Sequence, residues 1–377
     1  MEWAALVFLV LATLVHVASA AISIWRIRGH RASPPDPEQT LPPVSIIRPV
    51  CGLDPFDELT LRSTFTLDHP GLELLFCSAR DRDAAVPLVR RLIAEHPHVD
   101  ARLLIGDDKS TPNPKLNNVI KGWAAARHSW IVIADSNVLM PPNYVAQLMA
   151  EMQGDTALVC SPPVGSRPLG FWAEVECAFL NTYQARWQLA ADTVGFGFAQ
   201  GKSMLWRREV LDAAGGIRAL GIEVAEDAAA TKIVRGEGYR VRLVGAPFEQ
   251  PLGTRSRRQV LDRQIRWARL RRATFPLCYA PEVLTASVAP MCAAVLAAPL
   301  LDLDAAVAAG LVATLWFGTE AVLAKAAGWH LSLVSPVAWL VRDLSLPVVW
   351  LEGWIGDGFT WRGNDMTVAE PAEQGQA

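Results

Sequence analysis

The sequence predicts an α/β domain attached to a membrane by apolar segments at both ends of the chain. Short apolar runs alternate with helical patterns between residues 44 and 134, which favours a parallel sheet covered by helices on both faces. Uncharged stretches long enough to cross a bilayer lie before and after the domain. The composition agrees with this interpretation, because 51% of the 377 residues are hydrophobic and only 19% are charged.

The first segment, residues 1–31, is predicted to be a transmembrane anchor. Residues 3–25 contain no Lys, Arg, Asp or Glu, and at about 1.5 Å per residue such a helix crosses roughly 30 Å of hydrocarbon. Three arginines follow directly: Arg26, Arg28 and Arg31. The positive-inside bias therefore predicts a cytoplasmic location for this end and for the domain after it. Residues 18–20 resemble a signal-peptidase site, but the basic residues lie on the wrong side of the apolar run for a cleaved signal.

The region 281–362 is predicted to hold further membrane segments. Residues 283–301 carry no charge and residues 305–324 carry only Glu320, so these two segments are expected to cross as a hairpin. Residues 331–354 are also apolar but contain an adjacent Arg–Asp pair, and they are expected either to span or to lie in the interface. The reason is that a charged pair at mid-depth is costly unless it is buried against protein.

The middle of the chain is predicted to be the α/β domain, at residues 44–254. Composition indicates a Pro-rich linker at 32–43, a basic amphipathic helix at the membrane surface at 255–280, and a polar, disordered tail at 363–377. Apolar runs predict strands at residues 44–48, 72–78, 101–105 and 130–134. Helical patterns continue from the first strand to about residue 67 and cover residues 84–95 and 116–127. Ligands of open α/β sheets bind beyond the carboxyl ends of the strands, so the polar residues there are the candidate site.

Charge and cysteine content exclude several function classes. The net charge is −3, so the chain has no overall basic field for nucleic acid, and positive charge is confined to local clusters. The six cysteines form no C-x-x-C pair, which argues against a disulfide framework or a structural zinc site and favours a reducing compartment. Gly201-Lys202-Ser203 is similar to the end of a P-loop, but the preceding glycine spacing does not fit, which excludes ATP hydrolysis at this motif.

The fourth predicted strand is followed by Asp135-Ser136-Asn137. The side chains of Asp135 and Asn137 are expected to point into the same crevice, because residues two apart in an extended chain face one side. Their oxygen atoms suit Mg²⁺ or Mn²⁺. The pair resembles the D-x-D metal-and-diphosphate motif of nucleotide-sugar transferases, with Asn137 in place of the second carboxylate, and this resemblance implies an ion that bridges the donor phosphates and neutralises the departing diphosphate. The alternative is a turn aspartate that hydrogen-bonds its own backbone.

Two other places offer contacts to a nucleotide. The second strand is followed by a run of alternating charge, in which Asp81 or Asp83 is expected to bind the base or ribose; the alternative is a solvated, self-paired charge run. Lys115 lies at a helix start after Asn113, beside free backbone N–H groups, and is expected to bind an anion. Ordinary helix capping is the alternative there.

Two further motifs lie near the end of the predicted domain: an acidic pair, and a pair of arginines beside a tryptophan. Glu226 and Asp227 follow a Gly-rich loop and start an Ala-rich helix, so a carboxylate there acts either as general base toward a hydroxyl or only on the helix dipole. Arg263 and Arg266 share one helix face beside Trp267 and are expected to bind a diphosphate. A basic helix lying on anionic lipid is the alternative, and both can hold.

Taken in order, these motifs resemble the ceramide glucosyltransferase family, with the chain similar to a bacterial-type member. Three acidic positions followed by (Q/R)-x-x-R-W define the family pattern. The matching stretches are Pro114-Lys115-Leu116-Asn117-Asn118, Asp135-Ser136-Asn137, Ala225-Glu226-Asp227 and Ile265-Arg266-Trp267-Ala268-Arg269-Leu270-Arg271. The resemblance covers residues 44–362, with an N-terminal anchor and C-terminal hydrophobic segments as in the family.

The resemblance implies a GT-A fold, a Rossmann-like nucleotide-diphospho-sugar transferase domain, and a role for each motif. Asp135 and Asn137 hold Mg²⁺ or Mn²⁺ with the diphosphate, and Asp227 is the general base. The residues expected to contact substrate are Asp81, Asp83, Lys115, Glu226, Arg263, Arg266 and Trp267. The register of the first family acid is open between Asp81 and Asp83, and Ala228 stands where relatives usually carry an aromatic.

The implied reaction is an inverting transfer of glucose from UDP-glucose to the hydroxyl of ceramide, giving a glycosphingolipid. The implied location is a bacterial inner membrane, with the catalytic domain in the cytoplasm. Alternatives keep the chemistry but change the UDP-sugar or use a hopanoid or diacylglycerol acceptor. A processive polysaccharide synthase shares the final motif but normally needs more spanning helices. An alternative of another class is a non-catalytic membrane protein that binds nucleotide sugars.

Overall fold

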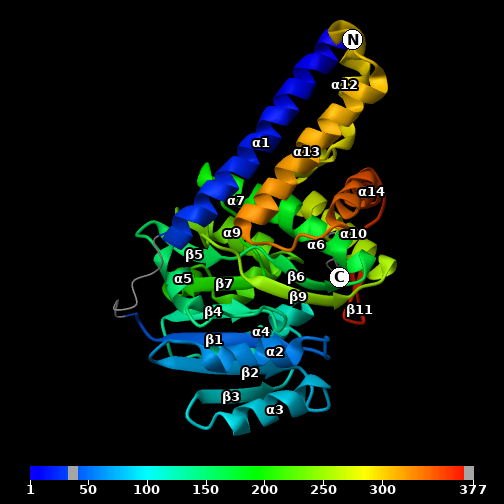
Figure 1. Cartoon of the computed structure of the whole chain (residues 1–377). Helices are drawn as coiled ribbons and strands as arrows, with labels where there is room; N and C mark the ends of the chain where they lie inside the picture. Colours follow the sequence, from blue (N-terminus) through cyan, green and yellow to red (C-terminus); the bar gives the residue numbers. More distant parts are fainter. Residues whose placement is uncertain (33–40, 369–377) are drawn as a thin grey trace, which may run out of the picture.

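The computed structural model describes residues 1–32 and 41–368, and its centre is a seven-stranded sheet (Figure 1). The strand order is β3-β2-β1-β4-β7-β5-β8. The strands are β1 (Val44–Val50), β2 (Leu72–Ser78), β3 (Asp100–Ile105), β4 (Trp130–Ala134), β5 (Thr156–Cys160), β7 (Ser203–Arg207) and β8 (Arg240–Leu243). The four predicted strands are confirmed as β1 to β4 and run parallel. The sheet as a whole is mixed, because β7 runs antiparallel to both β4 and β5.

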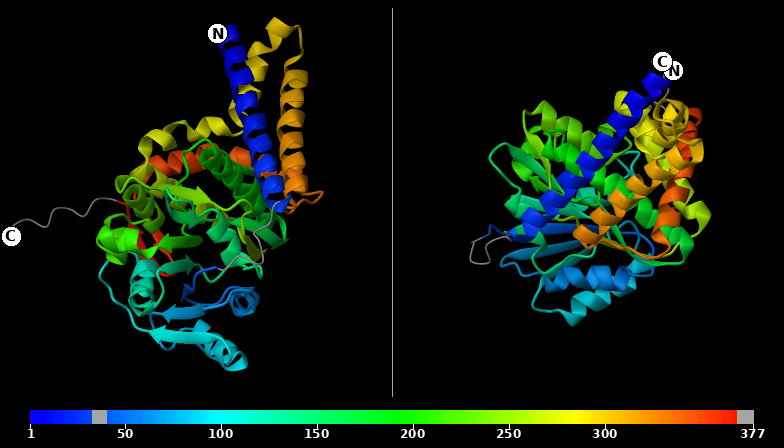
Figure 2. Two further views of the ribbon diagram at one scale, coloured as in Figure 1. Left: turned by 90° about the vertical axis from the view of Figure 1, so that its left-hand side faces the viewer. Right: turned by 45° about the horizontal axis from the view of Figure 1, so that its top comes forward.

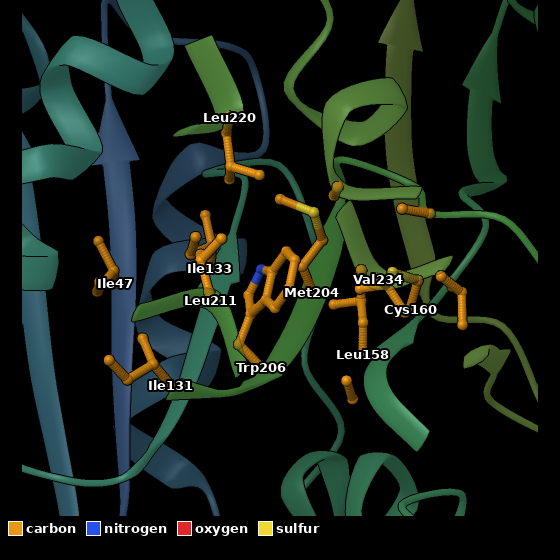
Figure 3. Packing of buried hydrophobic residues seen from close by; sticks show 14 of the residues in the cluster. Ile47, Ile131, Ile133, Leu158, Cys160, Met204, Trp206, Leu211, Leu220 and Val234 are labelled. Carbon is orange, nitrogen blue, oxygen red and sulfur yellow. The ribbon is translucent and has the colours of Figure 1, made fainter. Parts of the chain in front are cut away.

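Helices cover both faces of this sheet, as the alternating pattern predicts. Successive residues of a strand face opposite sides, so Ile46 packs in one core and Ile47 in the other. The core that contains Ile46 is covered by α2 (Asp57–Arg62), α3 (Ala85–Glu95) and α5 (Tyr144–Ala150). The core that contains Ile47 is covered by α4 (Pro114–Ala125), α8 (Arg208–Ala213) and α9 (Glu226–Gly236). Figure 3 shows part of the second core, with Trp206 of β7 between Ile133 of β4 and Leu158 of β5.

A second layer lies between the sheet and the apolar helices. Two strands, β6 (Val164–Leu169) and β9 (Glu249–Thr254), form a separate parallel pair. Between β6 and β7 the chain runs through α6 (Phe171–Ala178), a π-helix (Phe179–Ala185) and α7 (Arg186–Thr193). After β9 comes α10 (Arg257–Thr274), which lies inside the predicted basic segment and begins with a capping box between Ser256 and Gln259.

Two described helices are long and apolar enough to cross a membrane. They are α1 (Glu2–Ala32) and α13 (Ala305–Ala327), and a bent pair formed by 276–285 and 288–301 adds at most one further span. The second arm of that pair contains α12 (Val288–Ala297), which packs on both α1 and α13. Figures 1 and 2 show α1 and α13 side by side, extending away from the sheet toward the N-terminus.

The third apolar segment forms α14 (Ser335–Ile355), which packs against α6 and α10. Its Arg–Asp pair is fully buried: Arg342 contacts Asp343 at 2.7 Å and Glu320 of α13 at 2.8 Å. The Arg342 guanidinium also donates to the Thr182 hydroxyl of the π-helix. The pair is therefore buried against protein, which is the condition under which such charges are tolerated.

The beginning of the predicted C-terminal tail is an ordered strand and not a disordered segment. The predicted disordered tail began at residue 363, but Asn364–Thr367 forms β11 and pairs antiparallel with β10 (Gly358–Trp361). The rest of the predicted tail, residues 369–377, and most of the predicted linker, residues 33–40, lie outside the described residues.

We expect Arg342→Leu to lower the free energy of unfolding by about 3–5 kcal/mol, because Glu320 and Asp343 would stay buried without their cation. Thermal or chemical unfolding of the detergent-solubilised full chain measures this change. Arg240→Gln is the control, since its ion pair with Asp155 is exposed and should contribute little. Equal stability of the two variants would contradict the role given to the buried pair.

Candidate active site

The loop after β4 is shaped by a buried arginine on β1. The Arg48 guanidinium donates to the carbonyl oxygens of Asp135, Ser136 and Val138 at 2.8, 2.9 and 3.0 Å. It also donates to the carbonyl of Thr60 at 2.9 Å. Burial lowers the pKa of Arg48 to about 10, so the side chain stays charged at neutral pH. One cation therefore holds three of the four carbonyls of residues 135–138 in a fixed arrangement.

Lys115 connects the loop after β4 to the start of α9. Its ammonium lies 2.7 Å from Asp135 Oδ1 and 2.6 Å from Glu226 Oε1, and it donates to the carbonyl of Gly201 at 2.7 Å. The Asn113 side chain caps α4 and so positions Lys115 in the first helical turn. Burial opposes the charge of Lys115, but the attraction of Asp135 and Glu226 is larger and raises its pKa above the ordinary value. In the structure Lys115 thus pairs with carboxylates, while its predicted contact to an anionic substrate stays a prediction.

The two predicted metal ligands converge on one cationic position. The Lys202 ammonium lies 2.8 Å from Asp135 Oδ2 and 3.3 Å from Asn137 Oδ1. Burial would raise the pKa of Asp135, but Lys115 and Lys202 lower it below its usual range. Asp135 is therefore an anion at any physiological pH, and its oxygens and that of Asn137 can face a single cation.

This arrangement fits a divalent ion that is only partly bound by protein. Among the described residues no group of three or more His, Cys, Asp or Glu side chains is placed to hold a metal. Mg²⁺ and Mn²⁺ sites of this type use one or two carboxylate or amide oxygens and take the remaining ligands from phosphates and water. Lys202 occupies the position between Asp135 and Asn137, so it has to withdraw when an ion enters.

Glu226 and Asp227 are neighbours with different surroundings. Glu226 is paired with Lys115 and accepts a hydrogen bond from the Asn113 amide at 2.8 Å. Asp227 accepts only backbone N–H groups among the described residues, from Gly201 at 3.2 Å and Ala228 at 2.9 Å. Burial, and then the charge of Glu226, raise the pKa of Asp227 to about 6. Glu226 is thus held in an ion pair with Lys115, whereas Asp227 is a carboxylate able to take up a proton near neutral pH.

Gly201 permits this close arrangement. A Cβ atom at Gly201 would lie 3.0 Å from Glu226 Oε1, 3.4 Å from Lys115 Nζ and 3.6 Å from Asp227 Oδ2. The first of these distances is tighter than an ordinary van der Waals contact, so a side chain there would push Glu226 away from Lys115. The backbone of Gly201, which contacts both Lys115 and Asp227, therefore lies at the centre of the charged cluster.

The arginines of α10 are used differently from one another. Arg263 pairs with the buried Glu176 of α6, which Arg255 also contacts at 3.0 Å. Arg266 has no ion-pair partner among the described residues, and its guanidinium lies 5.7 Å from the centroid of the Trp361 ring. Burial, followed by repulsion from other arginines, lowers the pKa of Arg266 to about 10. Arg266 is therefore a cation without an ion-pair partner in the described part of the chain, and the charges of Asp135 and Glu226 attract it only from a distance.

The remaining predicted residues divide into surface, loop and packing positions. Asp81 lies on the surface and pairs with Arg90 at 2.6 Å. Asp83 accepts the N–H groups of Gly52 and Ala85, both at 2.9 Å, and so connects the loop after β1 to the start of α3. Trp267 packs on a small apolar cluster formed by Cys177, Leu180 and Leu252. Of the two candidates for the first acid, only Asp83 contacts the loop after β1.

Sequence reasoning missed two site residues. Arg48 lies inside a strand, and its contacts to the carbonyls after β4 come from segments far away in the chain. Lys202 was considered only as part of a P-loop, although it follows the glycine that contacts Asp227. A basic residue at the end of the predicted apolar run 44–48 is the available signal for Arg48, but periodicity alone gives it no partner.

Comparisons with known proteins identify the family and the fold of this chain. The family model described as glycosyl transferase family 21 matches residues 10–373. Ceramide glucosyltransferase 1 of Caenorhabditis elegans is 32% identical over 272 residues, which is 72% of this chain but 58% of the length of that relative. Ceramide glucosyltransferase 3 of the same organism is 29% identical over 373 residues, covering 95% of this chain and 79% of the relative.

The fold is also found in a solved structure. A mannosyltransferase from Pyrobaculum calidifontis, in complex with GDP-Man and Mn²⁺, superposes with a TM-score of 0.52 at 20% identity. The likeness covers 93% of this chain and 98% of that one. At this identity it shows the fold, which is the GT-A glycosyltransferase fold.

We expect Lys202→Met to tighten Mn²⁺ binding by about tenfold, because the ammonium that competes for Asp135 and Asn137 is removed. Electron paramagnetic resonance of free Mn²⁺, titrated with the full-length protein in the absence of any nucleotide, measures the dissociation constant. Lys232→Met is the matched control, since Lys232 pairs with Glu223 on the surface. Weaker Mn²⁺ binding by the Lys202 variant would show that the two oxygens are not a cation site.

Proposed function

We propose that this chain, which belongs to glycosyl transferase family 21, transfers glucose from UDP-glucose to the hydroxyl of ceramide and yields a glycosphingolipid. The names of its worm relatives support this choice of sugar and lipid. The observation that carries the chemistry is that Asp135 and Asp227, which are connected through Lys115 and Gly201, differ in their pKa. Asp135 is held ionised by its ion pair with Lys115, which also donates to the carbonyl of Gly201. Asp227 accepts the N–H of Gly201 and has a pKa of about 6.

On the donor side, Asp135 and Asn137 would hold Mg²⁺ or Mn²⁺. Such an ion, when bound, neutralises the charge that develops on the departing diphosphate. The complex of the structurally similar mannosyltransferase with Mn²⁺ is consistent with a divalent ion. Arg266, a cation without an acidic partner in the described part of the chain, would contact the same diphosphate. Arg263, Lys115 and Trp267 would orient these groups.

On the acceptor side, Asp227 would act as general base. As the lipid oxygen forms its bond to the anomeric carbon, the bond from that carbon to the diphosphate oxygen breaks and UDP leaves. The hydroxyl proton passes to Asp227, because a carboxylate with a pKa of about 6 is ionised at neutral pH and basic enough to take the proton. A single displacement of this kind inverts the configuration at the anomeric carbon. Glu226 would position Lys115 rather than take the proton.

The membrane orientation is part of the proposal. The helices α1 and α13 would cross a bacterial inner membrane, with Arg26, Arg28 and Arg31 on the cytoplasmic side. UDP-sugar is then available from the cytoplasm, and the lipid acceptor reaches the site from the adjoining leaflet. The apolar helices would thus anchor the catalytic domain in the membrane that contains the acceptor lipid. No nucleic-acid partner is proposed.

The direct test is product identification. Purified full-length protein is incubated with Mg²⁺ or Mn²⁺, a panel of UDP-sugars, and a panel of lipids that includes ceramide, diacylglycerol and a hopanoid; mass spectrometry then identifies the product. We expect a hexosylated ceramide, formed fastest from UDP-glucose. A glycosylated hopanoid or diacylglycerol would overturn the acceptor. Nucleotide-sugar binding without UDP release would indicate a non-catalytic binding protein.

We expect Asp227→Asn to lower kcat by about 10²–10⁴-fold while leaving UDP binding close to that of the wild type, because the amide cannot take the hydroxyl proton. Wild-type kcat should also fall as the pH drops below about 6, where Asp227 becomes protonated. Glu226→Gln is the neighbouring comparison and should act mainly on donor binding through Lys115. If Asp227→Asn keeps wild-type kcat, or if its only defect is lost UDP binding, another residue is the base.

A further inference from the structure

The short hairpin at the end of the described chain has an unusual tip. The turn between β10 and β11 contains Arg362 and Gly363, with φ angles of 49° and 78°. Positive φ at both central positions is the geometry of a two-residue hairpin turn, which favours Asn, Asp or Gly at the first position. An arginine there adopts a backbone conformation that costs energy unless the side chain gains something in return.

The base of this hairpin is attached to α10, the helix that carries Arg263, Arg266 and Trp267. Arg272 forms an ion pair with Asp357, and the Arg269 guanidinium donates to the carbonyl of Gly358. Trp361, the residue before the tip, lies under the Arg266 guanidinium. Figure 1 shows β11 below α14, close to the C-terminal end of the described chain. The hairpin and α10 therefore form one surface.

The tip of the hairpin contacts the loop after β1. Arg362 pairs with Asp54 at 2.7 Å, and a Cβ atom at Gly52 would lie 3.8 Å from its guanidinium. Gly52 is the residue whose N–H binds Asp83. In the same loop region Asp57 is buried, and its Oδ1 atom has no hydrogen-bond partner in the described part of the chain. The hairpin tip thus lies over the loop where the sheet would receive a nucleotide.

The arginines gathered here outnumber the acids that contact them. Arg255 and Arg263 share Glu176, Arg362 uses Asp54, and Arg266 has only the Trp361 ring within the residues described. Burial lowers the pKa of both Arg263 and Arg266, repulsion by Arg362 lowers both further, and repulsion by Arg263 adds to the effect at Arg266. A fold that holds like charges together at this cost is prepared for an anion.

We propose that the β10–β11 hairpin completes the donor site, with Arg362 exchanging Asp54 for the phosphates of a nucleoside diphosphate. Trp361 is a positioning residue that holds Arg266 toward the same phosphates. This inference rests on the proposed function, since it assumes a nucleotide-diphosphate donor. It adds a phosphate contact from outside the motifs of the catalytic domain, supplied by the segment that follows the apolar helices.

The test compares opposite changes at the two ends of one ion pair. Calorimetric titration of full-length protein in detergent with UDP and with UMP gives the dissociation constants. We expect Arg362→Gln to weaken UDP binding by about tenfold and UMP binding less, because a charge-assisted contact to the second phosphate is lost. Arg362→Lys should recover part of this loss. We expect Asp54→Asn to tighten UDP binding, because the competing carboxylate is gone.

The outcomes separate this inference from the proposed function. If the Arg362–Asp54 pair only holds the hairpin in place, Arg362→Gln and Asp54→Asn weaken UDP binding alike, and the inference is overturned. Wild-type UDP affinity in Arg362→Gln overturns it as well. Arg240→Gln is the control for loss of a partly exposed arginine. A wild-type protein that neither binds UDP nor releases it from UDP-sugars would instead sink the proposed function.

Discussion

The candidate site depends on the charge of Lys115. Three carboxylates, those of Asp135, Glu226 and Asp227, converge from the loop after β4 and the start of α9, and without a cation they would repel one another. Lys115 neutralises two of them and leaves Asp227 with a pKa of about 6. Its position follows from the cap at Asn113, which fixes the first turn of α4, and Asn113 also binds Glu226. The start of α4 therefore fixes the ion pairs of Lys115, and through them it influences the pKa of Asp227.

Elsewhere, buried arginines connect parts of the chain that are distant in sequence. Arg48 connects β1 with the loop after β4, and Arg342 connects α14 with α13 and the π-helix. Arg186 of α7 donates to the Ser19 hydroxyl at 2.7 Å and contacts the His16 ring of α1. A buried guanidinium is expensive to desolvate, but it has five N–H donors in one plane and so can donate hydrogen bonds to several acceptors at once. The domain and the apolar helices are joined by such contacts as well as by apolar packing.

Local sequence pattern was sufficient for some elements and not for others. The strands β1 to β4 were predictable because each is an apolar run bounded by polar or turn residues. The antiparallel β7 was not, since its place between β4 and β5 is decided by long-range pairing. Residues 364–367 look disordered by composition, yet β11 forms because Arg269 and Arg272 of α10 hold the hairpin. In the candidate site, motif spacing predicted Asp135, Lys115 and Asp227, which the structure brings together, but the partners of Arg48 and Lys202 come from other segments.

The contacts between α1 and the domain occur at two levels along the helix. His16 and Ser19 meet Arg186, and about two turns after Ser19 the side chain of Arg26 pairs with Asp192 and donates to the carbonyl of Leu243. A body attached at two points along one axis cannot tilt about either point alone. The domain is therefore carried at one fixed orientation relative to the α1 axis, so that any tilt of this helix in a bilayer is passed on to the sheet and to the candidate site.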